Sequence, residues 1–207
     1  MAFVPSKYSL ADLTVSATAD SLGLSNQPAN EDHENNLNLV AAFLSQLPFK
    51  VRINSAYRSP TVNTAVGGAK NSQHMQGLAM DITPLELSNK ELATWLWANR
   101  ADYPELDQVI WYTDTTHVHI GICPPGAVGC VEVRPRMAFY TARKEGSEYT
   151  RWLPDEASMA EVLRLYAQTR PVRTATFAAL ALGGALAVSA VGVVVALRLK
   201  RRRRRRA

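Results

Sequence analysis

The sequence predicts an α+β domain with a small, mainly antiparallel sheet flanked by helices, followed by a single C-terminal transmembrane helix. Strand and helix periodicities alternate over most of the chain, a stretch without charge occupies 174–197, and a run of cations follows it. Interleaved strands and helices of this kind favour an α+β fold. We therefore divide the chain into a folded domain at 1–170, a transmembrane helix at 174–197 and a polybasic tail at 198–207.

The first half of the domain predicts two helices around a strand. Asn30 precedes two acids and an apolar pattern of helical spacing, which Pro48 ends. Residues 51–54 alternate apolar and polar side chains, as a strand with one buried face does. Pro60 then opens a short helix that the glycines at 67–68 stop.

The second half predicts a strand at 80–82 and a helix whose capping box runs from Ser88 to Glu91. Two strands follow near 108–112 and 117–122, and we expect them to pair. Residues 134–152 resemble a hairpin that turns at Glu145-Gly146, and a last helix is expected over 159–166.

The net charge of +5 comes from the C-terminus. Eight of the 23 cations lie at 198–206, and without them 15 cations face 18 acids. A nucleic-acid-binding face on the domain is therefore not indicated. The 24 uncharged residues at 174–197 span about 36 Å as a helix, more than the roughly 30 Å of a bilayer core. They predict a single-pass anchor.

The arginine tail predicts the orientation of the anchor. Arginines stay on the cytoplasmic side of a membrane, yet residues 1–10 contain no signal peptide. These features are consistent with two membranes, a bacterial inner membrane and the internal membrane of a virion. The tail would lie on the cytoplasmic side of the first or on the interior side of the second. The partners expected for the tail are anionic lipid or packaged nucleic acid. The oligomeric state is not predicted.

Cys123 and Cys130 are the only cysteines, and a Pro-Pro-Gly segment lies between them. A short disulfide is expected if the domain is extracytoplasmic, and a reduced pair otherwise.

Side chains with metal-binding chemistry occur in two motifs. His74 and Asp81 belong to Ser72-Gln-His-Met-Gln-Gly-Leu-Ala-Met-Asp81, and His117 and His119 flank Val118. The two rings of the second motif point to one side of a strand. Two histidines and an aspartate around zinc leave a position for water, which is typical of a catalytic site.

At these residues the chain resembles the zinc peptidases of bacterial cell walls, which include D-alanyl-D-alanine carboxypeptidases and L-alanyl-D-glutamate endopeptidases. The family pattern Ser-x-His-x-x-Gly-x-Ala-x-Asp is met at 72–81. Ser55-Ala-Tyr-Arg-Ser-Pro60, Asn63 to His74 and Asp107-Gln-Val-Ile110 resemble the branch found in phages, and the likeness runs from about Lys7 to Leu153.

The resemblance implies that His74, Asp81 and His119 bind zinc. It also implies that Arg58 and Ser72 lie near a substrate carboxylate or the developing oxyanion. A fork-shaped guanidinium suits a peptidoglycan carboxylate. Ser72 has the alternative role of capping the turn that holds His74, and Arg58 that of a salt bridge.

The general base is the least defined residue. Many relatives have an acid three positions before the last zinc histidine, where this chain has Thr116. Asp114 and His117 are the candidates for the general base. The alternative for Asp114 is an ordinary aspartate in a turn. His117 has the further option of protonating the leaving amine.

These features predict a membrane-anchored zinc peptidase that hydrolyses amide bonds in peptidoglycan stem peptides, as a phage or virion-associated lytic enzyme. The alternative is a catalytically impaired, metal-binding structural or wall-binding membrane protein of a virion or envelope.

Overall fold

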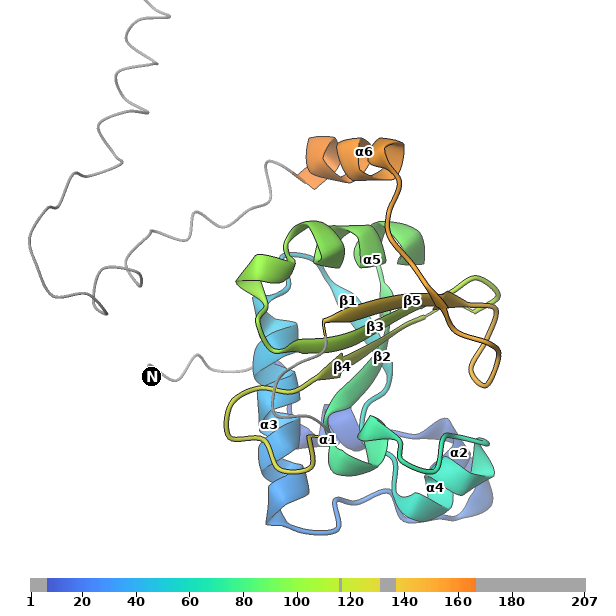
Figure 1. The fold of residues 1–207 in the computed structure, drawn as a ribbon. Helices are drawn as coiled ribbons and strands as arrows, with labels where there is room; N and C mark the ends of the chain where they lie inside the picture. The colour runs from blue at the N-terminus through green and yellow to red at the C-terminus, as the bar shows by residue number, and fades with distance from the viewer. Residues whose placement is uncertain (1–6, 116, 131–136, 167–207) are drawn as a thin grey trace, which may run out of the picture. The chain divides into compact units, whose positions relative to one another are not determined.

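The computed structural model of the protein describes residues 7–115, 117–130 and 137–166, all within one compact unit, Met1–Arg170. The helices are α1 (Leu10–Thr14), α2 (Ala17–Leu22), α3 (Glu31–Gln46), α4 (Pro60–Ala65), α5 (Asn89–Ala98) and α6 (Glu156–Tyr166), with 3-10 helices η1 (Gln73–Gln76) and η2 (Arg100–Asp102). The strands are β1 (Val51–Ser55), β2 (Ala79–Pro84), β3 (Leu106–Tyr112), β4 (Val118–Ile122), β5 (Ala138–Ala142) and β6 (Thr150–Arg151) (Figure 1).

The strands form a mixed sheet in the order β1-β2-β4-β3-β5-β6. Every adjacent pair is antiparallel except β3 and β5, which are parallel. The α+β class is thus confirmed, and the parallel pair is an addition to the predicted sheet. In this order β3 lies between β4 and β5, so the parallel pair joins two strands that are not consecutive in the sequence.

The two faces of the sheet differ in chemistry. On one face Ile82, Val109 and Ile120 are buried against the apolar sides of α3 and α5 in the main core. The other face has a small apolar cluster of Ile110, Tyr112 and Ala142, with Tyr140 packed against it. The polar side chains of the candidate site lie on this second face, which the large helices do not cover.

Helix ends follow the predicted capping chemistry. The Asn30 side chain accepts a hydrogen bond from the backbone N–H of His33 at 3.0 Å. Ser88 and Glu91 form the expected capping box. Helices α1 and α2 were not predicted, because five and six residues are too short to show a helical period.

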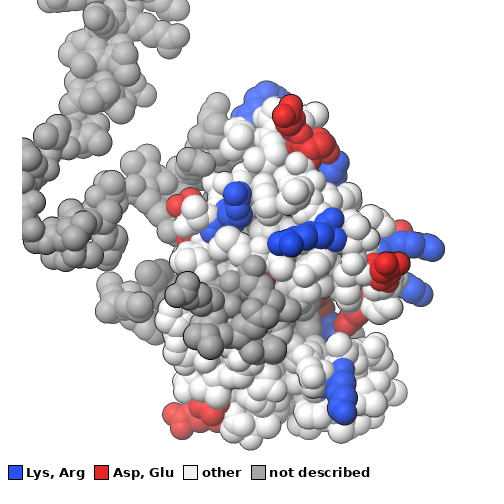
Figure 2. Space-filling model, in the orientation of Figure 1, with Lys and Arg blue, Asp and Glu red and all other residues white. Residues whose placement is uncertain are grey.

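Charged side chains of both signs are interspersed on the visible face of the domain (Figure 2). This distribution agrees with the near balance of charges outside the tail. No helix in the part of the chain that the structure describes is long and apolar enough to cross a membrane. The predicted anchor at 174–197 and the tail lie outside the described residues.

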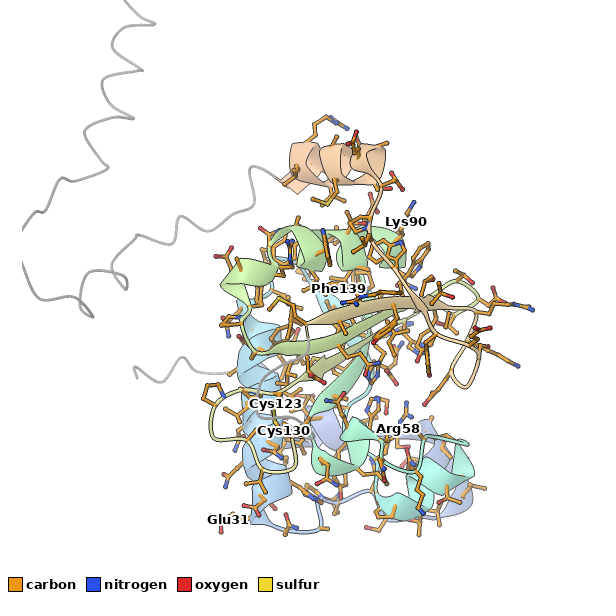
Figure 3. The ribbon with its side chains drawn as sticks, viewed as in Figure 1. Glu31, Arg58, Lys90, Cys123, Cys130 and Phe139 are labelled. Atoms are coloured by element: carbon orange, nitrogen blue, oxygen red, sulfur yellow. A yellow bond between two sulfur atoms is a disulfide. The ribbon has the colours of Figure 1, made fainter. Side chains whose placement is uncertain are left out.

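A disulfide joins Cys123 and Cys130, whose Cα atoms are 5.7 Å apart (Figure 3). Asn36 on α3 holds the enclosed loop, because its amide donates to the Val128 carbonyl at 2.7 Å and accepts from the Val128 N–H at 3.3 Å. The same amide donates to the carbonyl of Gln76, in η1, at 2.8 Å. The bonded form of the predicted cysteine pair is therefore the one present.

Replacing both cysteines with serine is expected to lower the free energy of unfolding by about 2–3 kcal/mol. A disulfide restricts the unfolded chain, and this is the size of the effect for a loop of about eight residues. Chemical denaturation of the oxidised protein and the double variant measures the difference. Equal midpoints for the two would contradict this expectation.

Candidate metal centre

Two of the three predicted ligands are partners in the sheet. Asp81 on β2 lies opposite His119 on β4, in antiparallel register. Directly opposed residues point to the same face, so the carboxylate and the imidazole meet. The distance between His119 Nδ1 and Asp81 Oδ1 is 2.9 Å.

The third ligand, His74, comes from η1, just before β2. Ser72 caps this helix, because its hydroxyl accepts from the His74 N–H at 3.4 Å. The His74 Nδ1 lies 2.6 Å from the carbonyl oxygen of Ala56. Since a carbonyl only accepts, Nδ1 is assigned the proton, and the lone pair of Nε2 faces the centre.

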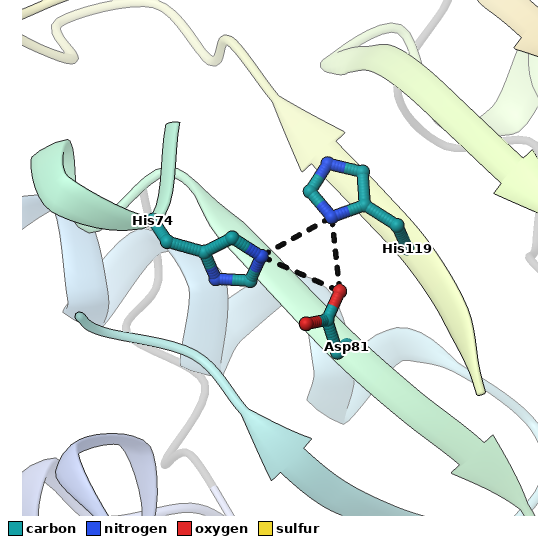
Figure 4. A group of neighbouring side chains, drawn as sticks. All are labelled: His74, Asp81 and His119. Carbon is teal, nitrogen blue, oxygen red and sulfur yellow. Dashed lines mark hydrogen bonds and ion pairs between the residues drawn. The ribbon is translucent and has the colours of Figure 1, made fainter. Parts of the chain in front are cut away.

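His74, Asp81 and His119 converge to a triangle of potential ligand atoms (Figure 4). The distance from His74 Nε2 is 3.2 Å to His119 Nδ1 and 3.3 Å to Asp81 Oδ1. Ligand atoms at about 2.0–2.1 Å from a tetrahedral zinc ion lie about 3.3–3.4 Å from one another. The spacing of the triangle therefore fits zinc, and three protein ligands leave the fourth position for water or substrate.

The pKa shifts of His74 and Asp81 favour the protonation states that bind a cation. Burial lowers the pKa of the His74 imidazole, although the Asp81 charge opposes the shift. Burial by itself raises the pKa of the Asp81 carboxyl, but the two imidazoles beside it hold that pKa well below its usual range. Neutral imidazole and ionised carboxylate are the forms that bind metals.

Arg58 lies beside the triangle, in the loop between β1 and α4 (Figure 3). Its Nη2 donates to Asp81 Oδ2, the oxygen of Asp81 that does not face the imidazoles. Its Nε donates to Ser55 Oγ, and its Nη1 donates to Glu145 Oε1, both at 3.0 Å. Arg58 is buried at 6% exposure, so its guanidinium holds the Asp81 carboxylate through the oxygen that does not face the imidazoles.

The other predicted substrate-binding residue, Ser72, has a local role in the structure. Its hydroxyl caps η1 and so supports the backbone of His74. This is the alternative role that its position at the start of a turn allowed. The structure brings Arg58, but not the Ser72 hydroxyl, into hydrogen-bond contact with the triangle.

The two candidates for the general base occupy different places. The ring of His117 packs against Tyr112 at 5.4 Å between centroids, and its Nε2 is buried without a hydrogen-bond partner in the described part of the chain. Asp114 is exposed, and its Oδ2 lies 3.0 Å from both Nε and Nη2 of Arg143. That contact lowers the pKa of Asp114. Among the described residues, its side chain contacts Arg143 and Thr113 and not the residues of the triangle.

The structure adds two residues that sequence reasoning missed. Glu145 pairs with Arg58 across 87 positions of sequence, and Tyr112 ends β3 on the face of the sheet that carries the triangle. Neither belongs to a local motif. The parallel pairing of β5 with β3 brings Glu145 to the site, and no residue pattern in the sequence indicated that pairing.

Gly77 follows the 3-10 helix that contains His74. It closes η1 with φ of 68°, and a Cβ there would lie 2.8 Å from the carbonyl oxygen of His33. Gly77→Ala is expected to destabilise the domain by about 2 kcal/mol or more, from the left-handed backbone and the clash together. Denaturation midpoints measure this. Gly126→Ala is the matched control, since its φ is also positive but no atom lies within 4 Å of the added Cβ.

A family model described as Peptidase M15 matches residues 6–121, more than half of the chain. The matched range includes the three residues of the triangle and Arg58, and it ends before the disulfide loop and the β5–β6 hairpin. No curated protein matches the chain.

Proposed function

This chain belongs to the M15 family of zinc peptidases that act on peptidoglycan, and on that premise we propose that it hydrolyses amide bonds in peptidoglycan stem peptides. The observation that carries the proposal is the triangle of His74, Asp81 and His119, whose spacing fits zinc. We assign these three residues as the zinc ligands. The reaction products distinguish a carboxypeptidase from an endopeptidase.

The side chains around the triangle have separate tasks in this proposal. Zinc, when bound, polarises the scissile carbonyl and makes water more acidic. Arg58 keeps the Asp81 carboxylate oriented through Oδ2, and the Ala56 carbonyl keeps the His74 ring in one tautomer. We assign His117 a donor role toward the developing negative charge, because its Nε2 is buried and has no partner among the described residues.

The proposed setting is a membrane whose outer face meets the cell wall. The Cys123–Cys130 disulfide is typical of proteins in oxidising compartments. The apolar stretch at 174–197 and the arginines after it are the features of a single-pass anchor with its tail on the inner side. We extend the proposal to an enzyme attached to a virion or bacterial inner membrane, with anionic lipid or packaged nucleic acid at the tail.

Purified cell walls test the activity. The full-length protein in detergent is expected to release soluble peptides, to lose this activity on chelation and to regain it when zinc is restored. Masses of the products identify the bond that is cut. Release that is unchanged by chelation would contradict the assigned zinc chemistry.

The same assay addresses the alternative that Thr116 suggested, a metal-binding wall protein without turnover. That protein would bind zinc and sediment with cell walls but release no peptide. Measuring zinc content, wall binding and peptide release on one preparation separates the two functions. Deletion of residues 174–207 is expected to release the protein from membranes, which tests the anchor independently.

A further inference from the structure

A zinc peptidase needs a group that accepts a proton from the attacking water, and Asp114 is engaged elsewhere. We propose that Glu145, in the turn between β5 and β6, is this general base. The inference rests on the proposed peptidase function and adds to it a catalytic residue from outside the stretch that matches the family model.

Backbone pairing places the turn of Glu145 beside the loop that leads to His119. The N–H of Thr113 donates to the Ala142 carbonyl, and that of Asp114 donates to the Arg143 carbonyl, both at 2.9 Å. The backbone pairing thus continues just beyond the last residues of β3 and β5, and Glu145 follows Arg143 by two residues. The turn of Glu145 therefore lies next to the segment that leads into β4 and His119.

A single guanidinium joins Glu145 to the candidate metal centre. Arg58 donates through Nη2 to Asp81 and through Nη1 to Glu145, and it is nearly buried between them. The ion pair with Glu145 uses Oε1, and a carboxylate has a second oxygen that can accept a proton. The Glu145 side chain is 38% exposed, so water can reach it from the solvent side.

Tyr112 ends β3 on the face of the sheet that carries the triangle. Burial, a hydrogen bond with Tyr149 and the charges of Asp81 and Glu145 together raise the pKa of Tyr112 far above its usual value. The Tyr112 hydroxyl therefore stays protonated and is not itself a candidate for the base.

Other carboxylates near this face are committed to structural contacts. Asp114 binds Arg143 at the surface, and Asp107 accepts a hydrogen bond from Gln73 Nε2 at 2.9 Å. Glu145 differs from both, because the side chain that holds it also holds a proposed zinc ligand. This contact positions it for chemistry at the centre.

The step balances as ordinary amide hydrolysis. Glu145 takes one proton from water as the water oxygen bonds to the carbonyl carbon. The C–N bond then breaks, and the proton passes from Glu145 to the leaving nitrogen. Glu145 returns to its carboxylate form, and one water molecule is consumed for each carboxylic acid and amine produced.

Glu145→Gln in the full-length, zinc-loaded protein tests the role. Its kcat for peptide release from cell walls is expected to fall by about 10²- to 10⁴-fold, the usual contribution of a general base. Zinc content and melting temperature are expected to stay near those of the unchanged protein. Glu145→Asp is expected to keep measurable activity, because it retains a carboxylate at this position.

Glu148→Gln is the matched control, because Glu148 is an exposed carboxylate of the same turn, and it is expected to leave kcat unchanged. If the activity of Glu145→Gln stays within about threefold of that of the unchanged protein, the role of Glu145 is overturned, while the proposed peptidase function stands. Loss of zinc from both Glu145 variants also overturns it, since the residue would then be structural. If the unchanged, zinc-loaded protein releases no peptide, the proposed function fails first, and with it this inference.

Discussion

Replacing His74 with alanine is expected to lower zinc affinity by more than about 100-fold and peptide release to background. Loss of a hydrogen-bonding partner of a ligand already costs about 10- to 100-fold in metal affinity, and His74 is proposed as a ligand itself. The ring is buried, and its Nε2 lies 3.2 Å and 3.3 Å from the other two ligand atoms. Removing it leaves two ligands and a space open to water. Competition with a chromogenic chelator measures the affinity.

His33→Ala is the control for this variant, because His33 on α3 contacts the Tyr57 hydroxyl at 3.3 Å and lies outside the triangle. It is expected to bind zinc as the unchanged protein does. Asp81→Asn extends the test, since the amide keeps the shape of the side chain and removes the charge. Full zinc affinity in both His74→Ala and Asp81→Asn would show that the ion binds elsewhere.

Arg58→Gln is expected to have the largest effect on stability, and the effect should depend on the metal. The guanidinium contacts two carboxylates, and without it Asp81 is a buried charge that has lost its cation. Removing one partner of a buried ion pair typically costs about 3–5 kcal/mol. Zinc compensates part of that loss because it is itself a cation beside Asp81. Urea denaturation with and without zinc measures both values.

Arg52→Gln is the control, because Arg52 on β1 is exposed and donates only a short-range hydrogen bond to Asn54, at 3.2 Å. Its effect is expected to be within about 0.5 kcal/mol. Arg58→Lys keeps the charge and loses the fork, so we expect a smaller loss of stability than in Arg58→Gln. Equal destabilisation of the metal-free and zinc-loaded forms by Arg58→Gln would argue against electrostatic support of Asp81.

Local patterns were sufficient to predict most of the secondary structure. The helix at 31–46 and the strand at 51–55 follow from the apolar periodicity and the flanking Asn30 and Pro48. Likewise, the hairpin expected near Glu145-Gly146 is present as β5 and β6, which pair antiparallel. These elements depend on neighbours in sequence, which is the information that a single sequence contains.

The candidate site was predictable only in part, for the same reason. Both ligand motifs were visible, and the side on which His119 points followed from strand geometry. The pairing of Arg58 with Glu145 depends on the parallel register of β5, a contact between segments 87 residues apart. Asp114 was a candidate for the general base because it is near His119 in sequence. In the structure its side chain binds Arg143, the residue after β5.

The contacts of Asn36 connect the redox state of the protein to its metal affinity. One amide on α3 holds both the loop closed by the cysteines and the end of the helix that presents His74. Reducing the disulfide is therefore expected to loosen a loop that shares the Asn36 side chain with the helix of His74. Purification under strongly reducing conditions would then yield a preparation with a lower share of bound zinc, although neither sulfur touches the ion.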